Sequence, residues 1–353
     1  MPPCGASTAE HRKRLLFLRG ILTLFFSARS GFAAAALPSG PLSRVHRLQL
    51  ELDGASSAAD APTTLVLKTA PPRGEGADDG ARLLAAANRS FEREVGFLKA
   101  MATEKPPLPS APFAYFAACD KASGRAAVLM EDCEAHGAVR ADSPVLGGDG
   151  DAPHALCADA APALVRALAA QHARFWGGGP FTLWRWLPDV NGAPLRAACH
   201  VGCFHSLAAS SPRAYFLASI VREFEPGLCA AALPDALARF GDVVPPQLRP
   251  SLSGLAAAAA GPILARLASG PRTLLHGSAV AANAFAPRGV LAGAEEGEAA
   301  AATVRFVDYA DVAAGRGALD VARLLASAMD PDDRRDPIIM LSAYCVCALE
   351  AKR

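Results

Sequence analysis

The sequence lacks an excess of charge of either sign. Among its 353 residues, 35 are Lys or Arg and 34 are Asp or Glu, which gives a formal net charge of +1 at pH 7. A protein that gathers nucleic acid or an anionic membrane through its overall field carries a strong positive excess. We therefore expect no nucleic-acid partner.

A long uninterrupted apolar run is also missing. The longest run near the start, 15–26, contains Arg19 and is shorter than the roughly 20 residues that cross a bilayer. No membrane span is expected. The basic residues 11–14 in front of this run fit either a secretory or organelle-targeting leader or a helix that packs on the first lobe.

Cysteine is too scarce for a disulfide framework. The nine cysteines are unevenly spaced, and their odd number leaves at least one of them unpaired. This usage favours a reducing compartment. We expect an intracellular, cytoplasmic protein, with organelle targeting by the N-terminal segment as the alternative.

The sequence does contain enough apolar material for a folded core. Hydrophobic residues make up 52% of the chain and charged residues 20%, so the burial of apolar surface can offset the entropy of ordering. The length favours two domains or one two-lobed unit of enzyme size. No internal repeat is visible, which argues against a solenoid.

Strand and helix patterns alternate in the first third of the chain. Residues 39–52 end in an apolar and polar alternation, and 63–69 is rich in β-branched and aliphatic residues, so these segments predict a strand pair. Helical spacing follows at 81–103. Two further strands are expected at 113–118 and 126–130.

Beyond residue 131, Ala-rich helical patterns dominate. They include a helix that carries Leu164, Leu168 and Phe175 on one face and an apolar helix at 252–267, whereas 141–153 has the composition of a surface loop. The predicted fold class is α+β, with a small mixed β lobe followed by a mainly helical large lobe. We place an N-terminal segment (a leader or an incomplete first strand) at 1–37, the small lobe at 38–132 and the large lobe at 133–353.

Residues that carry chemistry follow one another in a suggestive order. They are Lys68 at the end of the second expected strand, Glu94 in the following helix, Glu131 and Asp132 after the strand 126–130, His276 and Asn283 in a later loop, and Asp308 after an apolar run. Each of them taken alone is more often a solvated surface residue. Their order and spacing therefore matter more than any single position.

This arrangement resembles the aminoglycoside phosphotransferase and choline-kinase-like family of the protein-kinase-like superfold, in particular its ecdysteroid-kinase-like (CHK kinase-like) branch. The resemblance extends from about residue 38 to about residue 348 and implies a two-lobed kinase-like fold. It is carried by seven segments in the same order: L-V-L-K-T-A-P-P, F-E-R-E-V-G-F-L, A-V-L-M-E-D-C, A-L-A-A-Q-H-A-R-F-W, L-L-H-G-S-A-V-A-A-N-A-F, V-R-F-V-D-Y-A-D and G-R-G-A-L-D-V-A-R-L-L.

The resemblance implies an ATP site in the first lobe. Lys68 would contact the α- and β-phosphates of ATP, and Glu94 would hold its ammonium by an ion pair. The backbone of the segment Glu131, Asp132 and Cys133 would bind the adenine. The glycine-rich loop is only loosely matched, by S-G-P-L-S at 39–43.

The same resemblance implies a metal and catalytic site in the second lobe. Asn283 and Asp308 would hold Mg²⁺, a hard cation that prefers oxygen ligands, with Asp311 as a further candidate. His276 and Asp320 would support the catalytic loop from behind. The acceptor would be the hydroxyl group of a small-molecule alcohol, which the sequence does not identify.

One departure from the family pattern concerns the chemistry itself. The family has H-G-D-x-x-x-x-N where this chain has H-G-S-x-x-x-x-N, so Ser278 occupies the position of the catalytic aspartate. A neutral hydroxyl does not accept a proton near pH 7, and a positioned general base contributes about 10²- to 10⁴-fold in rate. Two functions follow: a phosphotransferase of reduced rate or with another base, and a pseudokinase that binds nucleotide or acts as a regulatory or scaffold protein.

Other motifs predict ordinary structural roles. C-H-x-x-C-x-H at 199–205 contains four possible zinc ligands, but its spacing matches no standard finger. Cys345 and Cys347 are expected to be free thiols, and the three tryptophans are expected to pack in the core. H-G-S does not match the G-x-S-x-G elbow of α/β-hydrolases, so a serine nucleophile is disfavoured.

Overall fold

The computed structural model describes the chain in separate ranges. These are 32–37, 43–50, 62–70, 89–120, 125–142, 161–177, 184–187, 271–293, 300–301 and 303–328, with the single residues 238, 246, 250 and 344. The fold of these ranges is mixed α+β with antiparallel sheets. The α+β class expected from the sequence is therefore confirmed.

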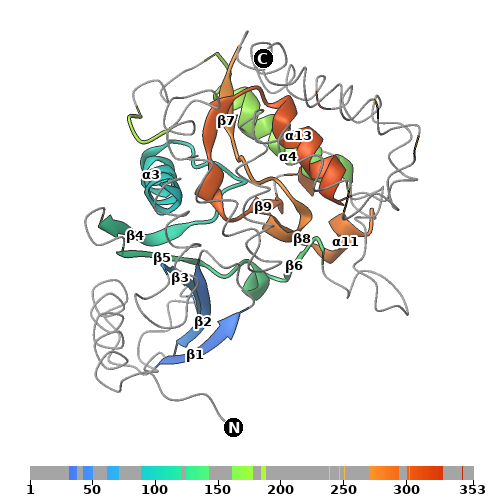
Figure 1. Cartoon of the computed structure of the whole chain (residues 1–353). Helices are drawn as coiled ribbons and strands as arrows, with labels where there is room; N and C mark the ends of the chain where they lie inside the picture. The colour runs from blue at the N-terminus through green and yellow to red at the C-terminus, as the bar shows by residue number, and fades with distance from the viewer. Residues whose placement is uncertain are drawn as a thin grey trace.

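A five-stranded sheet occupies the N-terminal part (Figure 1). Its strand order is β1-β2-β3-β5-β4, and all neighbouring strands run antiparallel. The strands are β1 (Phe32–Leu37), β2 (Arg44–Leu50), β3 (Thr64–Thr69), β4 (Ala114–Asp120) and β5 (Arg125–Glu131). The last four match the predicted strands to within a few residues. Strand β1 was not delineated from the sequence because F-A-A-A-A-L has no apolar and polar alternation.

Successive side chains along each strand point to opposite faces of this sheet, and the two faces belong to different hydrophobic clusters. Leu48, Leu65, Leu67 and Leu129 belong to one buried cluster, whereas Val66, Val128 and Met130 pack into the larger core that includes helix α3. Because successive side chains in a strand alternate, Lys68 lies on the same face as Val66. The pattern of β3 therefore aims a lysine toward α3.

Helix α3 (Ser90–Thr103) contacts both β4 and the short 3₁₀ turn η7 (Tyr309–Asp311). Its buried residues Phe91, Val95, Leu98 and Met101 recur every three or four positions, so one stripe of the helix faces the core. The helix ends where predicted, at Thr103. The first part of the predicted helix, 81–88, lies outside the described residues.

The other α-helices within the described ranges are α4 (Ala161–Arg174), α11 (Arg288–Leu291) and α13 (Ala318–Ala328). Two small sheets accompany them: β6 (Ala138–Arg140), β8 (Ala284–Pro287) and β9 (Arg305–Phe306) form one, and β7 (Thr273–Leu275) and β10 (Ala313–Gly315) form the other. Strands of two to four residues are too short to leave a periodic signal. The predicted helix 252–267 and nearly all of the predicted loop 141–153 lie outside the described ranges. Within the ranges, no helix has the length and hydropathy needed to cross a membrane.

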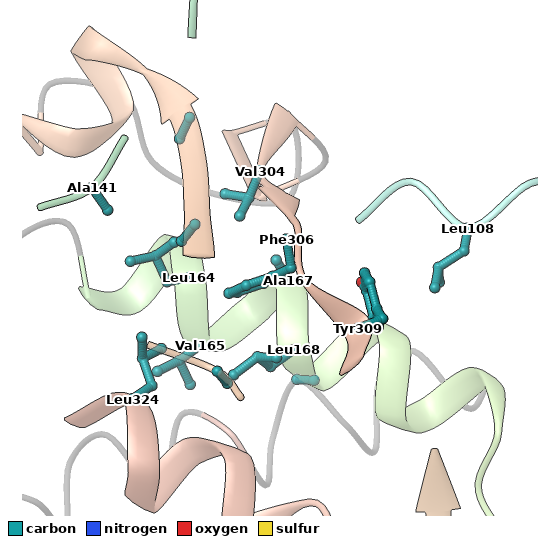
Figure 2. Close-up of a cluster of buried hydrophobic side chains, with 14 of the residues drawn as sticks. Leu108, Ala141, Leu164, Val165, Ala167, Leu168, Val304, Phe306, Tyr309 and Leu324 are labelled. Carbon is teal, nitrogen blue, oxygen red and sulfur yellow. The ribbon is translucent and has the colours of Figure 1, made fainter. Parts of the chain in front are cut away.

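Helix α4 lies at the centre of the larger core (Figure 2). Its residues Leu164, Val165 and Leu168 are fully buried, with Phe306 of β9 on one side and Leu324 of α13 on another. Apolar surface removed from water here stabilises the packing of the small sheets against the helices. The elements that carry His276, Asn283 and Asp308 are therefore fixed to one hydrophobic core.

We predict that Leu168→Ala lowers the free energy of unfolding by about 2 to 5 kcal/mol, because it removes buried methyl groups and leaves a cavity. Phe113→Ala is the control, since Phe113 is 59% exposed, and we expect it to cost no more than about 0.5 kcal/mol. Chemical denaturation of both variants measures the difference. Equal effects would contradict the central position of α4.

Candidate functional site

Lys68 is held between two carboxylates that come from distant parts of the chain. Its Nζ lies 2.9 Å from Oε1 and 2.8 Å from Oε2 of Glu94, and 2.5 Å from Oδ1 of Asp308. Glu94 is fully enclosed on α3, whereas the Asp308 side chain is 43% exposed. One ammonium thus joins β3, α3 and the segment after β9, with Asp308 on the solvent side.

The charges in this cluster stabilise one another. Burial alone would lower the pKa of Lys68, but Asp308 and Glu94 raise it above its ordinary value. Burial would raise the pKa of Asp308, but the Lys68 ammonium lowers it, so this carboxylate remains ionised near neutral pH. Burial raises the pKa of Glu94, and the Lys68 ammonium limits that rise. Hydrogen bonds to Oε1 of Glu94 and Oδ1 of Asp308 use two of the three donors of the ammonium.

Asp308 is positioned by an unusual backbone conformation. Its φ is 66°, in the left-handed region that Asp tolerates better than most residues. The preceding amide, Val307 N–H, donates to the Asn283 carbonyl at 2.9 Å. This bond ties the segment that carries Asp308 to the loop 276–283.

His276 holds that loop together from inside. Its Nδ1 accepts a hydrogen bond from the Ser278 amide at 3.1 Å, so its Nε2 carries the proton and donates to the Val307 carbonyl at 3.0 Å. Burial lowers the pKa of His276 below its ordinary value, which matches a neutral imidazole with one donor and one acceptor. Both ring nitrogens are used, so His276 has a positioning role and no free basic nitrogen.

Asn283 completes the loop by binding the same serine. Its side-chain nitrogen donates to the Ser278 carbonyl at 2.9 Å. Because a carbonyl only accepts, the amide NH₂ must face Ser278, and Oδ1 of Asn283 is the atom left to bind a cation. Among the described residues, no hydrogen bond involves the Ser278 hydroxyl.

Asp320 anchors the loop from behind. Its carboxylate accepts hydrogen bonds from the backbone amides of His276 (2.6 Å) and Gly277 (2.9 Å), and from the imidazole of His172 (3.0 Å). Burial would raise the pKa of Asp320, but the hydrogen bond and charge of His172 lower it below its ordinary value. The other ring nitrogen of His172 lies 2.9 Å from the Tyr344 hydroxyl. Two backbone amides directed at one buried carboxylate fix the loop's orientation.

Gly277 is required at the tightest point of the loop. Its φ is +79°, and a Cβ added there would lie 1.9 Å from the Asp311 carbonyl oxygen. Only a residue without a side chain lets the loop approach η7 this closely. The Arg323 guanidinium also donates to the Gly277 carbonyl.

The three residues expected to bind adenine are the last residue of β5, Glu131, and the two that follow it. The Asp132 side chain is buried and is bound by Arg47 of β2, and Glu131 lies 3.5 Å from Arg305. Cys133 begins the turn η1 (Cys133–His136), and burial raises the pKa of its thiol to about 12. Cys133 is therefore no thiolate nucleophile at neutral pH.

Several residues of this site were missed by the sequence analysis. The ring of Tyr309 stacks on Phe97 of α3 with centroids 3.7 Å apart, and its hydroxyl donates to Oε1 of Gln171 at 3.2 Å. Ser110 also donates to Gln171, at 3.1 Å. The only sequence signal for Gln171 is that a polar residue lies on the apolar face of a helix, three positions after Leu168.

A second buried cation was missed in the same way. Arg93 of α3 is 4% exposed, and its guanidinium lies 3.4 Å from Asp311. Burial lowers the pKa of Arg93, and Asp311 opposes that effect. From the sequence, a charged residue next to Glu94 on a helix is expected to be exposed. The burial of Arg93 follows only from the packing of α3 against η7.

The oxygen donors fit a hard cation. Asp308 supplies a carboxylate and Asn283 a carbonyl oxygen, both suitable for Mg²⁺. No group of three or more His, Cys, Asp or Glu side chains in the described ranges forms a cage for a metal. Mg²⁺ commonly takes only one or two carboxylates and completes its shell with phosphate and water oxygens.

The tryptophans lie against or beside the core. Trp184 and Trp186 stack on each other at 5.2 Å and pack against the core, in agreement with a structural role. Trp176 is partly buried at the end of α4. The 199–205 cluster, Cys345, Cys347 and the 39–42 part of the loosely matched glycine loop lie outside the residues that the structure describes.

No protein-family model matches the chain, and no curated protein matches it at the threshold of significance.

We predict that Gly277→Ala destabilises the protein more than Gly137→Ala. Both glycines have positive φ (79° and 78°), so both variants bear a conformational cost of about 1 kcal/mol or more, but only Gly277 has a neighbouring atom in the way. Thermal melting should show at least about twice the loss for Gly277→Ala. Similar losses would contradict the close approach of the loop to Asp311.

The depressed pKa of His276 predicts a pH effect on stability. The unfolded chain takes up a proton on this imidazole near pH 6.5, but the folded protein does so only at lower pH, so stability from His276 is lost as pH falls below about 6.5. His276→Asn cannot titrate. We expect the gap in melting temperature between wild type and this variant to narrow from about pH 7.5 to about pH 5. A constant or widening gap would show that His276 is not held neutral.

Proposed function

We propose that the chain is a kinase-like protein of two lobes, related to the aminoglycoside phosphotransferase and choline-kinase-like family, that binds ATP with Mg²⁺. Its reaction would be phosphoryl transfer to the hydroxyl group of a small molecule. The observation that carries the proposal is the contact of Lys68 with both Glu94 and Asp308. These residues lie 26 and 240 positions from Lys68 in sequence, and the resemblance assigns all three to one triphosphate site.

The local chemistry supports phosphate at this position. Lys68 keeps its charge despite burial, because the two carboxylates raise its pKa, and its third donor is suited to a phosphate oxygen. The Asp308 side chain is partly exposed to solvent. The hydrogen bond of Asn283 to the loop uses its side-chain nitrogen, which leaves its Oδ1 for a cation. Bound there, Mg²⁺ would neutralise charge on the β- and γ-phosphates.

The side chain at position 278 limits the rate of phosphoryl transfer. The two backbone polar groups of Ser278 are bound by His276 and Asn283, so residue 278 is held at a defined position whatever its side chain. A serine there gives no general base, and His276 has no free nitrogen to replace it. Phosphoryl transfer depends chiefly on positioning and electrostatics, so we expect slow transfer rather than loss of nucleotide binding.

The alternative function is that of a pseudokinase with a regulatory or scaffold role. Ser278 favours this alternative. The Lys68, Glu94 and Asp308 cluster favours nucleotide binding in either case.

Nucleotide binding is tested by the melting temperature with ATP, with and without Mg²⁺. A ligand that binds only the folded state stabilises it by about 2.7 kcal/mol at about 100 times its dissociation constant, so wild type should melt several degrees higher. Asp308→Asn should lose the Mg²⁺-dependent part of this rise. Asp142→Asn, at an ion pair with Arg140 on another segment, should keep it. No rise in wild type would refute nucleotide binding.

Catalysis is tested by ATP consumption in wild type and in Ser278→Asp, screened against hydroxyl-bearing small molecules. Restoring a carboxylate at this position should increase the rate by about 10²- to 10⁴-fold. Turnover in wild type supports the phosphotransferase, whereas turnover only in Ser278→Asp supports the pseudokinase.

A further inference from the structure

Arg47 of β2 reaches across the sheet to the segment that follows β5. Its Nε lies 2.6 Å from Oδ2 of Asp132 and its Nη2 lies 3.2 Å from Oδ1, and Nη2 also contacts Glu134. Strand β3 separates β2 from β5 in the sheet. Because neighbouring strands are about 4.8 Å apart, the side chain must extend over β3 to make this contact.

Strand register determines which face Arg47 crosses. Its neighbour Leu48 belongs to the cluster on the face away from α3, so Arg47 points to the opposite face, toward α3. Across the sheet, Arg47 pairs with Val66 and Val66 with Met130. Arg47 thus covers the face that also carries Lys68, two residues or about 7 Å further along β3.

The charges around Arg47 make it a poor phosphate ligand. Two carboxylates bind one guanidinium, so the group has a net negative charge and its edge donors are largely occupied. A guanidinium whose edge is bound in this way still has two flat faces, on which aromatic rings stack well. The Arg47 side chain is 30% exposed, so part of this surface remains open.

We propose that Arg47 is the residue on which the nucleotide base stacks, held flat by Asp132 and Glu134, while Lys68 binds the phosphates further along the same sheet face and Asp308 holds the Mg²⁺ that accompanies them. This inference rests on the proposed function. It makes β2 a determinant of base binding and gives the Asp132 side chain a positioning role beside the backbone role that the resemblance implies.

The experiment compares ATP with inorganic tripolyphosphate, which has no base, both in the presence of Mg²⁺. Calorimetric titrations use wild type, Arg47→Lys and the control Gln49→Ala, which changes another residue on the same face of β2. Lys keeps the ion pair with Asp132 but has no planar group. We expect Arg47→Lys to bind ATP about tenfold more weakly and tripolyphosphate within about twofold of wild type. Gln49→Ala should match wild type for both ligands.

A second variant guards against a folding defect. The double variant Arg47→Ala, Asp132→Asn removes both charges of the Arg47–Asp132 ion pair, so it leaves no unpaired charge on the buried Asp132 position. Its affinity for tripolyphosphate reports whether the phosphate site is intact. It should show the same selective loss of ATP affinity as Arg47→Lys.

The outcomes separate the two proposals. If wild type binds neither ligand, the proposed function fails and the inference fails with it. If wild type binds ATP but the Arg47 variants bind it equally well, Arg47 only braces the sheet and the stacking inference alone is overturned. Tighter binding of ATP by the variants would also overturn it, because Arg47 would then obstruct the base.

Discussion

The buried ammonium of Lys68 is the constraint on which this structure depends. A lysine enclosed by protein loses its hydration, and the loss is tolerable only with opposite charges in contact. Glu94 and Asp308 provide them, from a helix and from a segment 240 positions away. Satisfying this one charge therefore requires β3, α3 and the β9 to η7 segment to converge. A structure in which they did not converge would bury an unpaired charge.

The loop 276–283 is built on the same principle, with hydrogen bonds in place of an ion pair. Asp320 gathers two backbone amides, His276 links Ser278 to Val307, and Asn283 binds the Ser278 carbonyl. These hydrogen bonds satisfy polar groups that the low dielectric of a core would otherwise penalise. Tyr309 then connects this loop to α3, because its ring contacts that of His276 and stacks on that of Phe97. The cluster of Lys68, Glu94 and Asp308 and the loop 276–283 are thus parts of one packed unit.

Much of this arrangement could be predicted from the sequence, for physical reasons that differ between elements. Strand β2 and helix α3 leave a period of 2 or 3.6 because one face of each is more deeply buried. Strand β5 is buried on both faces and was predicted instead as a short apolar run. Short sequence segments were enough to single out five residues as candidates for the site: Lys68, Glu94, His276, Asn283 and Asp308. Strand β1, with four consecutive alanines, and the strands of two to four residues have no such period. They exist because neighbouring segments supply hydrogen bonds.

Side-chain partners were the hardest to predict. Arg47, Arg93 and Gln171 are polar residues whose roles depend on what lies across the fold from them. The register of β2 and β3 sends Arg47 over Val66 toward Asp132, and nothing near Arg47 in sequence indicates this. Gly277 is different, because an H-G pair before a loop could have suggested a tight turn, although the contact with Asp311 could not be foreseen.

Within the part of the chain that the structure describes, residue 278 is held in place by its backbone alone. Every described bond that holds residue 278 is made by its backbone, to His276 and Asn283, and neither bond needs a particular side chain. A hydroxyl in place of a carboxylate at such a position would remove a proton acceptor from the loop. It would leave unchanged the hydrogen bonds that position Asn283 and Asp308. Under the proposed function, nucleotide binding and catalysis would therefore be separable.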